Sequence, residues 1–223
     1  MIFIRMQKRV KTLTESSSAL SPGQRLPLPQ ARRDSSTSIE AVLSARRSVR
    51  DYAPAPLTVA DVSQLLWAAQ GVSGTGGLRT APSACAIYPL RTYLLAGAVK
   101  SLPSGIYGYD PDAHELECLS RGDRRAGLFE ACGEQVCASE CAVAVLLTGW
   151  FTRALRELGP KAPDLARIEA GHAGQNFLLQ ACALGLGGVG LGKYDPEAIK
   201  QVFTVPTNQV PLYILLAGKP ETL

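Results

Sequence analysis

The chain has 223 residues, of which 46% are hydrophobic and 19% charged, a composition typical of a globular protein. No apolar run approaches the ~18 residues that a membrane-spanning helix needs, and the apolar start at residues 1–5 is too short for a signal peptide, so we expect a cytoplasmic protein without membrane contacts. The net charge of +4 is uneven, with +7 on residues 1–50 and −3 on the remainder, which argues against a general nucleic-acid-binding surface.

The N-terminal third predicts a basic arm followed by the start of a domain. Residues 1–36 are rich in serine, proline and basic residues without a sustained period, which indicates a flexible arm, and a single domain is expected over residues 37–223. The capping box at residues 37–40 (TSIE) predicts a short helix that leads into the arginine-rich residues 45–52 (ARRSVRDY). A second capping box at residues 58–61 opens a helix that ends at Gly71.

The rest of the chain alternates helices and strands without a regular βαβ rhythm, which favours an α+β fold. Strands are expected at 92–96, 106–109, 115–119, 142–148 and 211–217, and helices at 124–132, 164–184 and from 195 onward. The helix at 164–184 is apolar nearly all round, so it belongs in a core or in a subunit interface.

The arginine-rich residues 45–52 have two interpretations. Arginine presents a planar fork of donors that matches phosphate oxygens two at a time, and Arg46 and Arg50, four residues apart, would share one side of a helical turn. The same residues could form a solvated basic helix end. These residues alone leave both interpretations open.

Other candidate motifs are weak when taken singly. Residues 185–192 (GLGGVGLG) follow a helix rather than a strand, which does not fit a dinucleotide-binding fingerprint. His172, in a mostly apolar helix, is interpreted as a hydrogen-bonded core residue, and His114 as a surface strand residue. The six cysteines include no CxxC pair, and only Cys137 and Cys141 stand one helical turn apart, so we expect buried thiols and no metal ion.

Taken together, the motifs resemble the FMN-dependent nitroreductase family, and most closely its SagB-type dehydrogenase branch. The likeness runs from about residue 38 to residue 220 and depends on the order and spacing of several segments. These are residues 46–52 (RRSVRDY), 65–71 (LLWAAQG), 79–84 (RTAPSA), 88–90 (YPL), 105–110 (GIYGYD), 169–172 (EAGH) and 185–187 (GLG).

The resemblance implies a mostly antiparallel central sheet flanked by helices, in an intertwined homodimer that binds FMN at its interface. Arg46 would hold the FMN phosphate, and Arg47 and Ser48 would contact the phosphate and ribityl region. Arg50 would lie near the N1–O2 edge of the flavin and stabilise its reduced form. Two further groups would meet the ring: Pro82, Ser83 and Ala84 from the partner chain, and the backbone of Gly187, Gly188 and Val189.

The implied activity is ping-pong hydride transfer from NADH or NADPH through FMN to a small acceptor such as a nitro compound or a quinone. FMN carries the chemistry, so no catalytic side chain is assigned with certainty. An alternative is a SagB-like azoline dehydrogenase that acts on a modified peptide. A second alternative is a non-enzymatic flavin-binding module whose basic arm contacts a partner.

Two departures from the family pattern bear on these expectations. Many nitroreductases continue past the last strand and return a Lys/Arg pair to the phosphate, whereas Lys219 is the only cation at the end of this chain. Azoline oxidases of the SagB branch carry a Lys-Tyr pair after the strand that corresponds to residues 142–148. Residues 150–159 (WFTRALRELG) contain no such pair, which argues against azoline oxidation.

Overall fold

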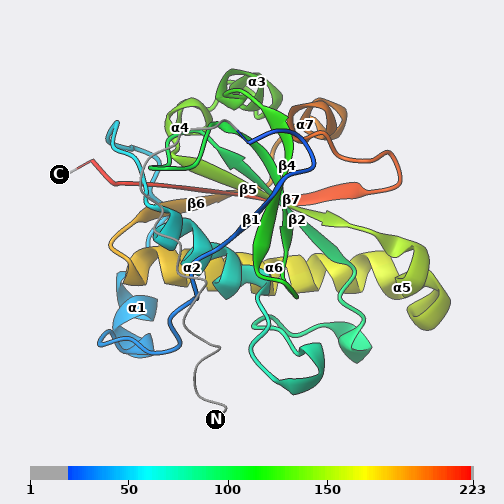
Figure 1. Cartoon of the computed structure of the whole chain (residues 1–223). Coiled ribbons are helices and arrows are strands. Elements are labelled where there is room, and N and C mark those ends of the chain that lie inside the picture. The colour runs from blue at the N-terminus through cyan, green and yellow to red at the C-terminus, as the bar shows by residue number, and fades with distance from the viewer. Residues whose placement is uncertain (1–19, 222–223) are drawn as a thin grey trace, which may run out of the picture.

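The protein, seen in a computed structural model that describes residues 20–221, is a seven-stranded sheet between two layers of helices (Figure 1). The strand order is β1-β4-β3-β2-β5-β7-β6, and every neighbouring pair is antiparallel. The strands are β1 (Arg25–Pro27), β2 (Leu90–Ala96), β3 (Gly105–Asp110), β4 (Glu115–Arg121), β5 (Val143–Gly149), β6 (Gly187–Leu191) and β7 (Val210–Gly218). The α+β class with a mostly antiparallel sheet is therefore confirmed.

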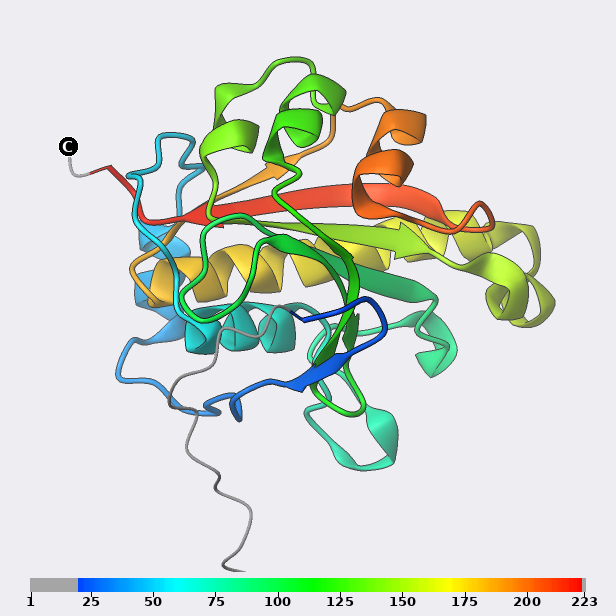
Figure 2. The same ribbon diagram turned by 45° about the horizontal axis from the view of Figure 1, so that its top comes forward.

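The helices divide between the two faces of the sheet (Figures 1 and 2). Helices α2 and α6 pack against each other on one face, with α1 and α5 beside the two ends of α6, while α3, α4 and α7 cover the other face. The helices are α1 (Ile39–Ala45), α2 (Val59–Gln70), α3 (Arg125–Ala131), α4 (Val136–Glu140), α5 (Phe151–Leu158), α6 (Ala162–Ala183) and α7 (Pro196–Phe203).

The central strand β5 has hydrophobic neighbours on both sides because both faces of the sheet are covered. All seven of its residues are buried, which explains its continuous apolar run (VAVLLTG). Val145 and Leu147 pack into the core that faces α2 and α6, and Ala144 and Leu146 into the core that faces α3, α4 and α7.

The helix starts follow the local capping signals. Thr58 and Asp61 form the expected reciprocal capping box of α2, and Gly71 follows its last residue. At α1 the cap is Ser38, whose hydroxyl accepts from the Ala41 amide, one residue later than the expected capping box implied. Helices α4 and α5 and the short strand β1 are additional elements for which no expectation was made.

Residues 20–36 of the expected arm pack on the domain, which differs from the boundary expected at residue 37. Strand β1 pairs with β4 at the edge of the sheet. The Arg32 backbone exchanges hydrogen bonds with the Gln64 side chain on α2, and Ser63 on α2 donates to the Pro29 carbonyl. Residues 1–19 lie outside the described part of the chain. Within the described part, none of the helices is both long and apolar enough to cross a bilayer.

Candidate functional site

The arginine-rich segment lies along the free edge of the sheet. Ser48 forms a parallel bridge with Gly188 of β6, where the Val49 amide donates to the Gly188 carbonyl at 3.0 Å. Tyr52 forms an antiparallel bridge with Pro220, and the Ala53 amide donates to the Lys219 carbonyl at 2.9 Å. The backbone hydrogen bonds of an edge strand thus hold this segment against β6 and the end of β7.

Glycine at position 187 makes this close approach possible. A Cβ atom on Gly187 would lie 2.7 Å from Val49 Cγ1, and one on Gly218 would lie 2.8 Å from the Tyr52 ring. The buried Tyr52 ring also donates through its hydroxyl to the Val49 carbonyl at 3.0 Å. The glycines therefore admit the arginine-rich segment of the same chain, a role that the sequence alone did not reveal.

Anchoring by Val49 and Tyr52 leaves the cations of the segment turned away from the core. Arg47, Ser48 and Arg50 are exposed and Arg46 is half-buried. Among residues 20–221, none of these arginines forms an ion pair with a carboxylate. Arg47 instead donates to the carbonyls of Ser44 and Arg46. Uncompensated guanidinium groups on one segment attract an anion such as phosphate.

Eight of the eleven expected cofactor-binding residues meet at this edge. Gly188 and Val189 lie on β6 and Lys219 directly follows β7, so their backbones are neighbours of the arginine-rich segment. The Val189 side chain is buried in the core, so only its backbone can face a ligand. The set is Arg46, Arg47, Ser48, Arg50, Gly187, Gly188 and Lys219, with Val189 beside them through its backbone.

The remaining expected residues, Pro82, Ser83 and Ala84, follow a loop that contacts α6 nearer to the middle of the helix, at Glu169 and Asn176. Ser83 is beside Glu169, whereas a Cβ atom on Gly188 would contact Leu178 and Ala181. Leu178 and Ala181 follow Glu169 by nine and twelve positions, which corresponds to about 14–18 Å along the helix axis. One chain therefore does not bring the two predicted ring-binding groups together.

Glu169 is a buried carboxyl that sequence reasoning left without a role. It lies on α6 with only 2% of its surface exposed. Its Oε1 atom, Nε2 of Gln70 and Nε of Arg79 are all buried without a hydrogen-bond partner in the described part of the chain. Arg79 NH1 donates to Gln70 Oε1 at 2.9 Å, so the three side chains form one incompletely paired polar cluster. The available sequence signal was a lone acid in an otherwise apolar stretch of helix.

Burial raises the pKa of Glu169 to about 7 from its ordinary 4.5. Desolvation of the carboxylate is the dominant cause, and the Ser83 hydroxyl, the Arg79 charge and the Gln70 amide offset only part of it. The Gln70 amide and the Ser83 hydroxyl lie near the carboxylate, but the Oε1 atom of Glu169 has no hydrogen-bond partner in the described part of the chain. A proton on Glu169 therefore exchanges near neutral pH.

The structure bears differently on the predictions made for the two histidines and for the cysteines one helical turn apart. His172 is exposed in this chain, so its interpretation as a core residue is wrong. His114 lies in the β3–β4 turn at φ 52°, where it contacts the Ser63 and Tyr109 hydroxyls and the Pro29 carbonyl. Cys137 and Cys141 are buried as expected, and burial raises the pKa of each thiol. The described residues contain no group of ligands arranged for a metal ion.

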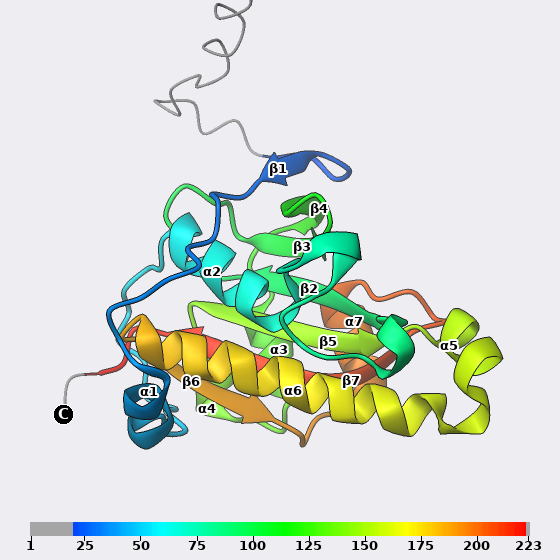
Figure 3. The same ribbon diagram turned by 90° about the horizontal axis from the view of Figure 1, so that it is seen from below.

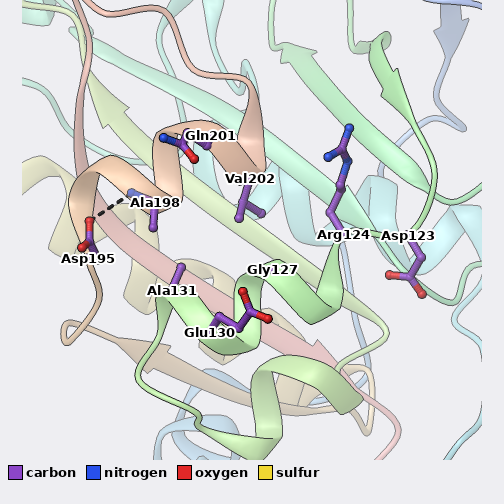
Figure 4. Close-up of a pocket in the computed structure, with 9 residues that line it drawn as sticks. All are labelled: Asp123, Arg124, Gly127, Glu130, Ala131, Asp195, Ala198, Gln201 and Val202. Carbon is purple, nitrogen blue, oxygen red and sulfur yellow. Dashed lines mark hydrogen bonds between the residues drawn. The ribbon is translucent and has the colours of Figure 1, made fainter.

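A pocket of about 520 Å³ lies elsewhere, between α3 and α7 on the face opposite α6 (Figure 4). Two of its acidic side chains already have partners. Asp123 forms a salt bridge with Arg125, and Asp195 caps α7 by accepting hydrogen bonds from the Glu197 and Ala198 amides. None of the expected cofactor-binding residues lines this pocket. Its carboxylates disfavour a phosphate ligand, so we place the candidate site at the edge of the sheet.

Comparison with known proteins shows the family of the chain. Residues 43–219 match the model of the Nitroreductase family. The chain is 32% identical over 181 residues to a Methanocaldococcus jannaschii protein named "Putative nitroreductase MJ1384", covering 81% of this chain and 90% of that one.

Solved structures share the fold. A Ralstonia eutropha protein described as a "putative nitroreductase" has a TM-score of 0.78 at 25% identity, and the match covers 94% of this chain and 99% of that chain. An Anabaena variabilis counterpart has a TM-score of 0.80 at 24% identity, but this chain spans only 45% of it. The Escherichia coli microcin synthetase McbBCD complex contains a similar chain, with a TM-score of 0.71 at 21% identity that covers 80% of this chain and 70% of that one.

The tight contact at Gly187 generates a first prediction. Gly187→Ala places a methyl group against Val49, so we expect a loss of about 1–3 kcal/mol in the free energy of unfolding. Gly192→Ala is the matched control, because no atom lies within 4 Å of its added Cβ. Urea denaturation compares the two, and equal stability of both variants would contradict the assigned role of Gly187.

The raised pKa of Glu169 generates a second prediction. The folded protein binds this proton more tightly than the unfolded chain, so its stabilising effect is complete below about pH 4.5 and is lost as the pH rises through about 7. Glu169→Gln should therefore gain stability over the wild type on going from pH 5 to pH 8, by up to about 3 kcal/mol. Urea denaturation at both pH values measures this gain. A constant difference between the two proteins would show that Glu169 titrates normally.

Proposed function

The chain belongs to the nitroreductase family of oxidoreductases, and we propose that it is an FMN-dependent enzyme that transfers hydride from NADH or NADPH to a small acceptor, such as a nitro compound or a quinone. The observation that carries this proposal is the arginine-rich segment at the edge of the sheet. Its guanidinium groups lack carboxylate partners in the described residues, and backbone bonds to β6 hold them in place.

The residues at this edge fit a phosphate-bearing cofactor. Arg46, Arg47 and Ser48 would hold the phosphate and the adjoining ribityl chain through charge-assisted hydrogen bonds. Lys219 follows β7 next to them and would add a further positive charge. FMN, when bound, would supply the hydride chemistry, while the protein supplies position and charge.

Arg50 would serve the ring rather than the phosphate. It lies on the side of the segment that faces Cys137 of α4, where its charge lowers the pKa of that thiol against the effect of burial. A cation fixed at this place stabilises negative charge that develops next to it. We therefore assign to Arg50 the stabilisation of the reduced cofactor.

A complete site would need two chains. The backbone at Gly187 and Gly188 and the segment Pro82, Ser83 and Ala84 are both assigned to the ring, yet they contact α6 at positions about 14–18 Å apart along its axis. A second chain would place its residues 82–84 next to the arginine-rich segment of the first. A homodimer with FMN at its interface satisfies this requirement.

The outer face of α6 supports this arrangement. Seen from below, α6 crosses the molecule with no other helix over it (Figure 3). Ile168 on that helix is 56% exposed, and no atom lies within 4 Å of a Cβ placed on Gly171. Ile39 and Leu43 of α1 are exposed to a similar degree. Apolar side chains beside a small residue favour close packing of another chain.

The alternatives make different demands on the same protein. An azoline dehydrogenase of the SagB branch would oxidise a heterocyclised peptide without nicotinamide, and a binding module would hold FMN that nicotinamide cannot reduce. Helix α5, which follows β5, carries no Lys-Tyr pair, so we rank the azoline dehydrogenase below the NAD(P)H-dependent enzyme.

The proposal predicts a yellow protein whose FMN affinity depends on Arg46. Arg46→Ala should raise the FMN dissociation constant about 10- to 100-fold, because it removes a charge-assisted contact to the phosphate. Arg124→Ala is the matched control, because Arg124 stands at the start of α3, on the face of the sheet opposite α6, and not in the arginine-rich segment.

Flavin fluorescence titration measures both affinities, and anaerobic NADH or NADPH should bleach the bound flavin of the wild type. A colourless wild type that takes up no added FMN would refute the proposal. Bound FMN that neither nicotinamide reduces would favour the binding module, and turnover of a heterocyclised peptide by the same protein would favour the azoline dehydrogenase.

A further inference from the structure

We propose that Glu169 is a positioning residue of the proposed FMN site: it holds the Ser83 hydroxyl beneath the ring-binding segment, and its charge opposes reduction of the bound flavin. This inference rests on the proposed function, because Ser83 is assigned to the ring. It gives a role to the residues 169–172 (EAGH), whose carboxyl the proposed hydride transfer does not use.

The segment that receives the ring is held in a strained conformation. Cys85, Ala86 and Tyr88 adopt left-handed backbone angles, with φ of 50°, 52° and 52°. Such angles are unfavourable for residues other than glycine and persist only where neighbours impose them. Here the Ala86 amide donates to the Ser83 carbonyl at 3.0 Å, and the Asn176 side chain on α6 donates to the Thr80 carbonyl at 3.2 Å.

Ser83 is the centre of this turn. Its hydroxyl oxygen accepts a hydrogen bond from the Tyr88 amide at 2.9 Å, which uses one acceptor position and leaves the hydroxyl proton available for donation. Tyr88 in turn accepts from the Arg79 amide at 3.2 Å, and the Arg79 guanidinium stacks over the Tyr88 ring at 4.7 Å. The buried carboxyl group beside Ser83 is that of Glu169, and the Ser83 hydroxyl lowers the pKa of this group against the larger effect of burial.

The elements around Glu169 leave its charge only partly compensated. Gln70 faces it from α2, and Arg79 and Ser83 face it from the loop before η2 (Ala84–Ala86); within residues 20–221, Arg79 is the one charged group that faces it. Arg79 donates a hydrogen bond to Gln70 through NH1, and its Nε has no hydrogen-bond partner. Among the described residues, Arg79 forms no salt bridge with Glu169. A carboxylate in so poorly solvated a place acts on nearby charge more strongly than one at the surface.

The consequence is a pH-dependent influence on the cofactor. Ionised Glu169 would repel the negative charge that reduction adds to a flavin bound against Ser83, whereas protonated Glu169 would not. Because the pKa of Glu169 lies near 7, this influence changes within the neutral range.

The test is the midpoint potential of bound FMN, from which the preference for reduced over oxidised FMN follows. At about 1.5 pH units above the pKa of Glu169, Glu169→Gln should increase this preference about three- to tenfold over the wild type. The same distance below that pKa, the two proteins should agree, because both then carry a neutral side chain. Asp164→Asn removes a charge from an exposed carboxyl on the same helix and should have no effect at either pH.

The result that overturns the inference is a Glu169→Gln effect that is absent or equal at both pH values. On a Ser83→Ala background, where the held hydroxyl is gone, Glu169→Gln should add less than about half of its effect, and a full effect would mean that Glu169 does not act through Ser83. If Glu169→Gln does not fold, Ser83→Ala takes its place and must increase the preference for reduced FMN more at the higher pH than at the lower one. A wild type that binds no FMN refutes the proposed function, whereas FMN binding without the Glu169 effect refutes this inference alone.

Discussion

The structure depends on the contact between the arginine-rich segment and the edge of the sheet. Val49 packs against Gly187 and Tyr52 against Gly218, at separations that any side chain at either glycine would prevent. The Val49 and Ala53 amides then complete the backbone pairing. Because the apolar members of the segment face inward, the guanidinium groups between them face outward. The packing of two hydrophobic residues thus sets where the positive charge of the proposed site lies.

The length of α6 imposes the second constraint. This helix packs along the sheet and places the arginine-rich segment at one end and the strained turn around Ser83 nearer to its middle. A rigid helix cannot shorten, so the points at which the two ring-binding groups contact α6 stay about 14–18 Å apart along its axis. The same helix leaves Ile168 and Gly171 uncovered. Its geometry accounts both for an incomplete single-chain site and for a surface that a second chain could cover.

The sequence predicted those features that depend on local signals. The capping box at Thr58, the stop at Gly71 and the apolar run of β5 each depend on a few neighbouring residues, and the structure confirms them. It could not predict that residues 25–27 form an edge strand, because that pairing with β4 depends on residues about 90 positions away. His172 was misread for a similar reason, since helical periodicity gives no side of α6 a clear polarity.

The candidate site was predictable in part. Its cations and glycines were found as motifs, but the reason for Gly187 is a steric contact with Val49 that no motif contains. Glu169 was visible as a residue, whereas its raised pKa comes from burial beneath a loop about 85 positions earlier in the chain. Long-range packing therefore supplied the information that local patterns lacked.

The central claim, that one FMN site draws on two chains, can be tested by subunit complementation. One chain would carry Arg46→Ala with Arg50→Ala, and the other Ala84→Trp to obstruct the ring-binding segment; two affinity tags would isolate the hybrid pair. If the site is shared, one of its two sites contains both intact halves, so the hybrid should bind one FMN per pair while each parent binds almost none. If each site lies within a single chain, every site carries a defect, and a hybrid that binds no more FMN than its parents would contradict the claim.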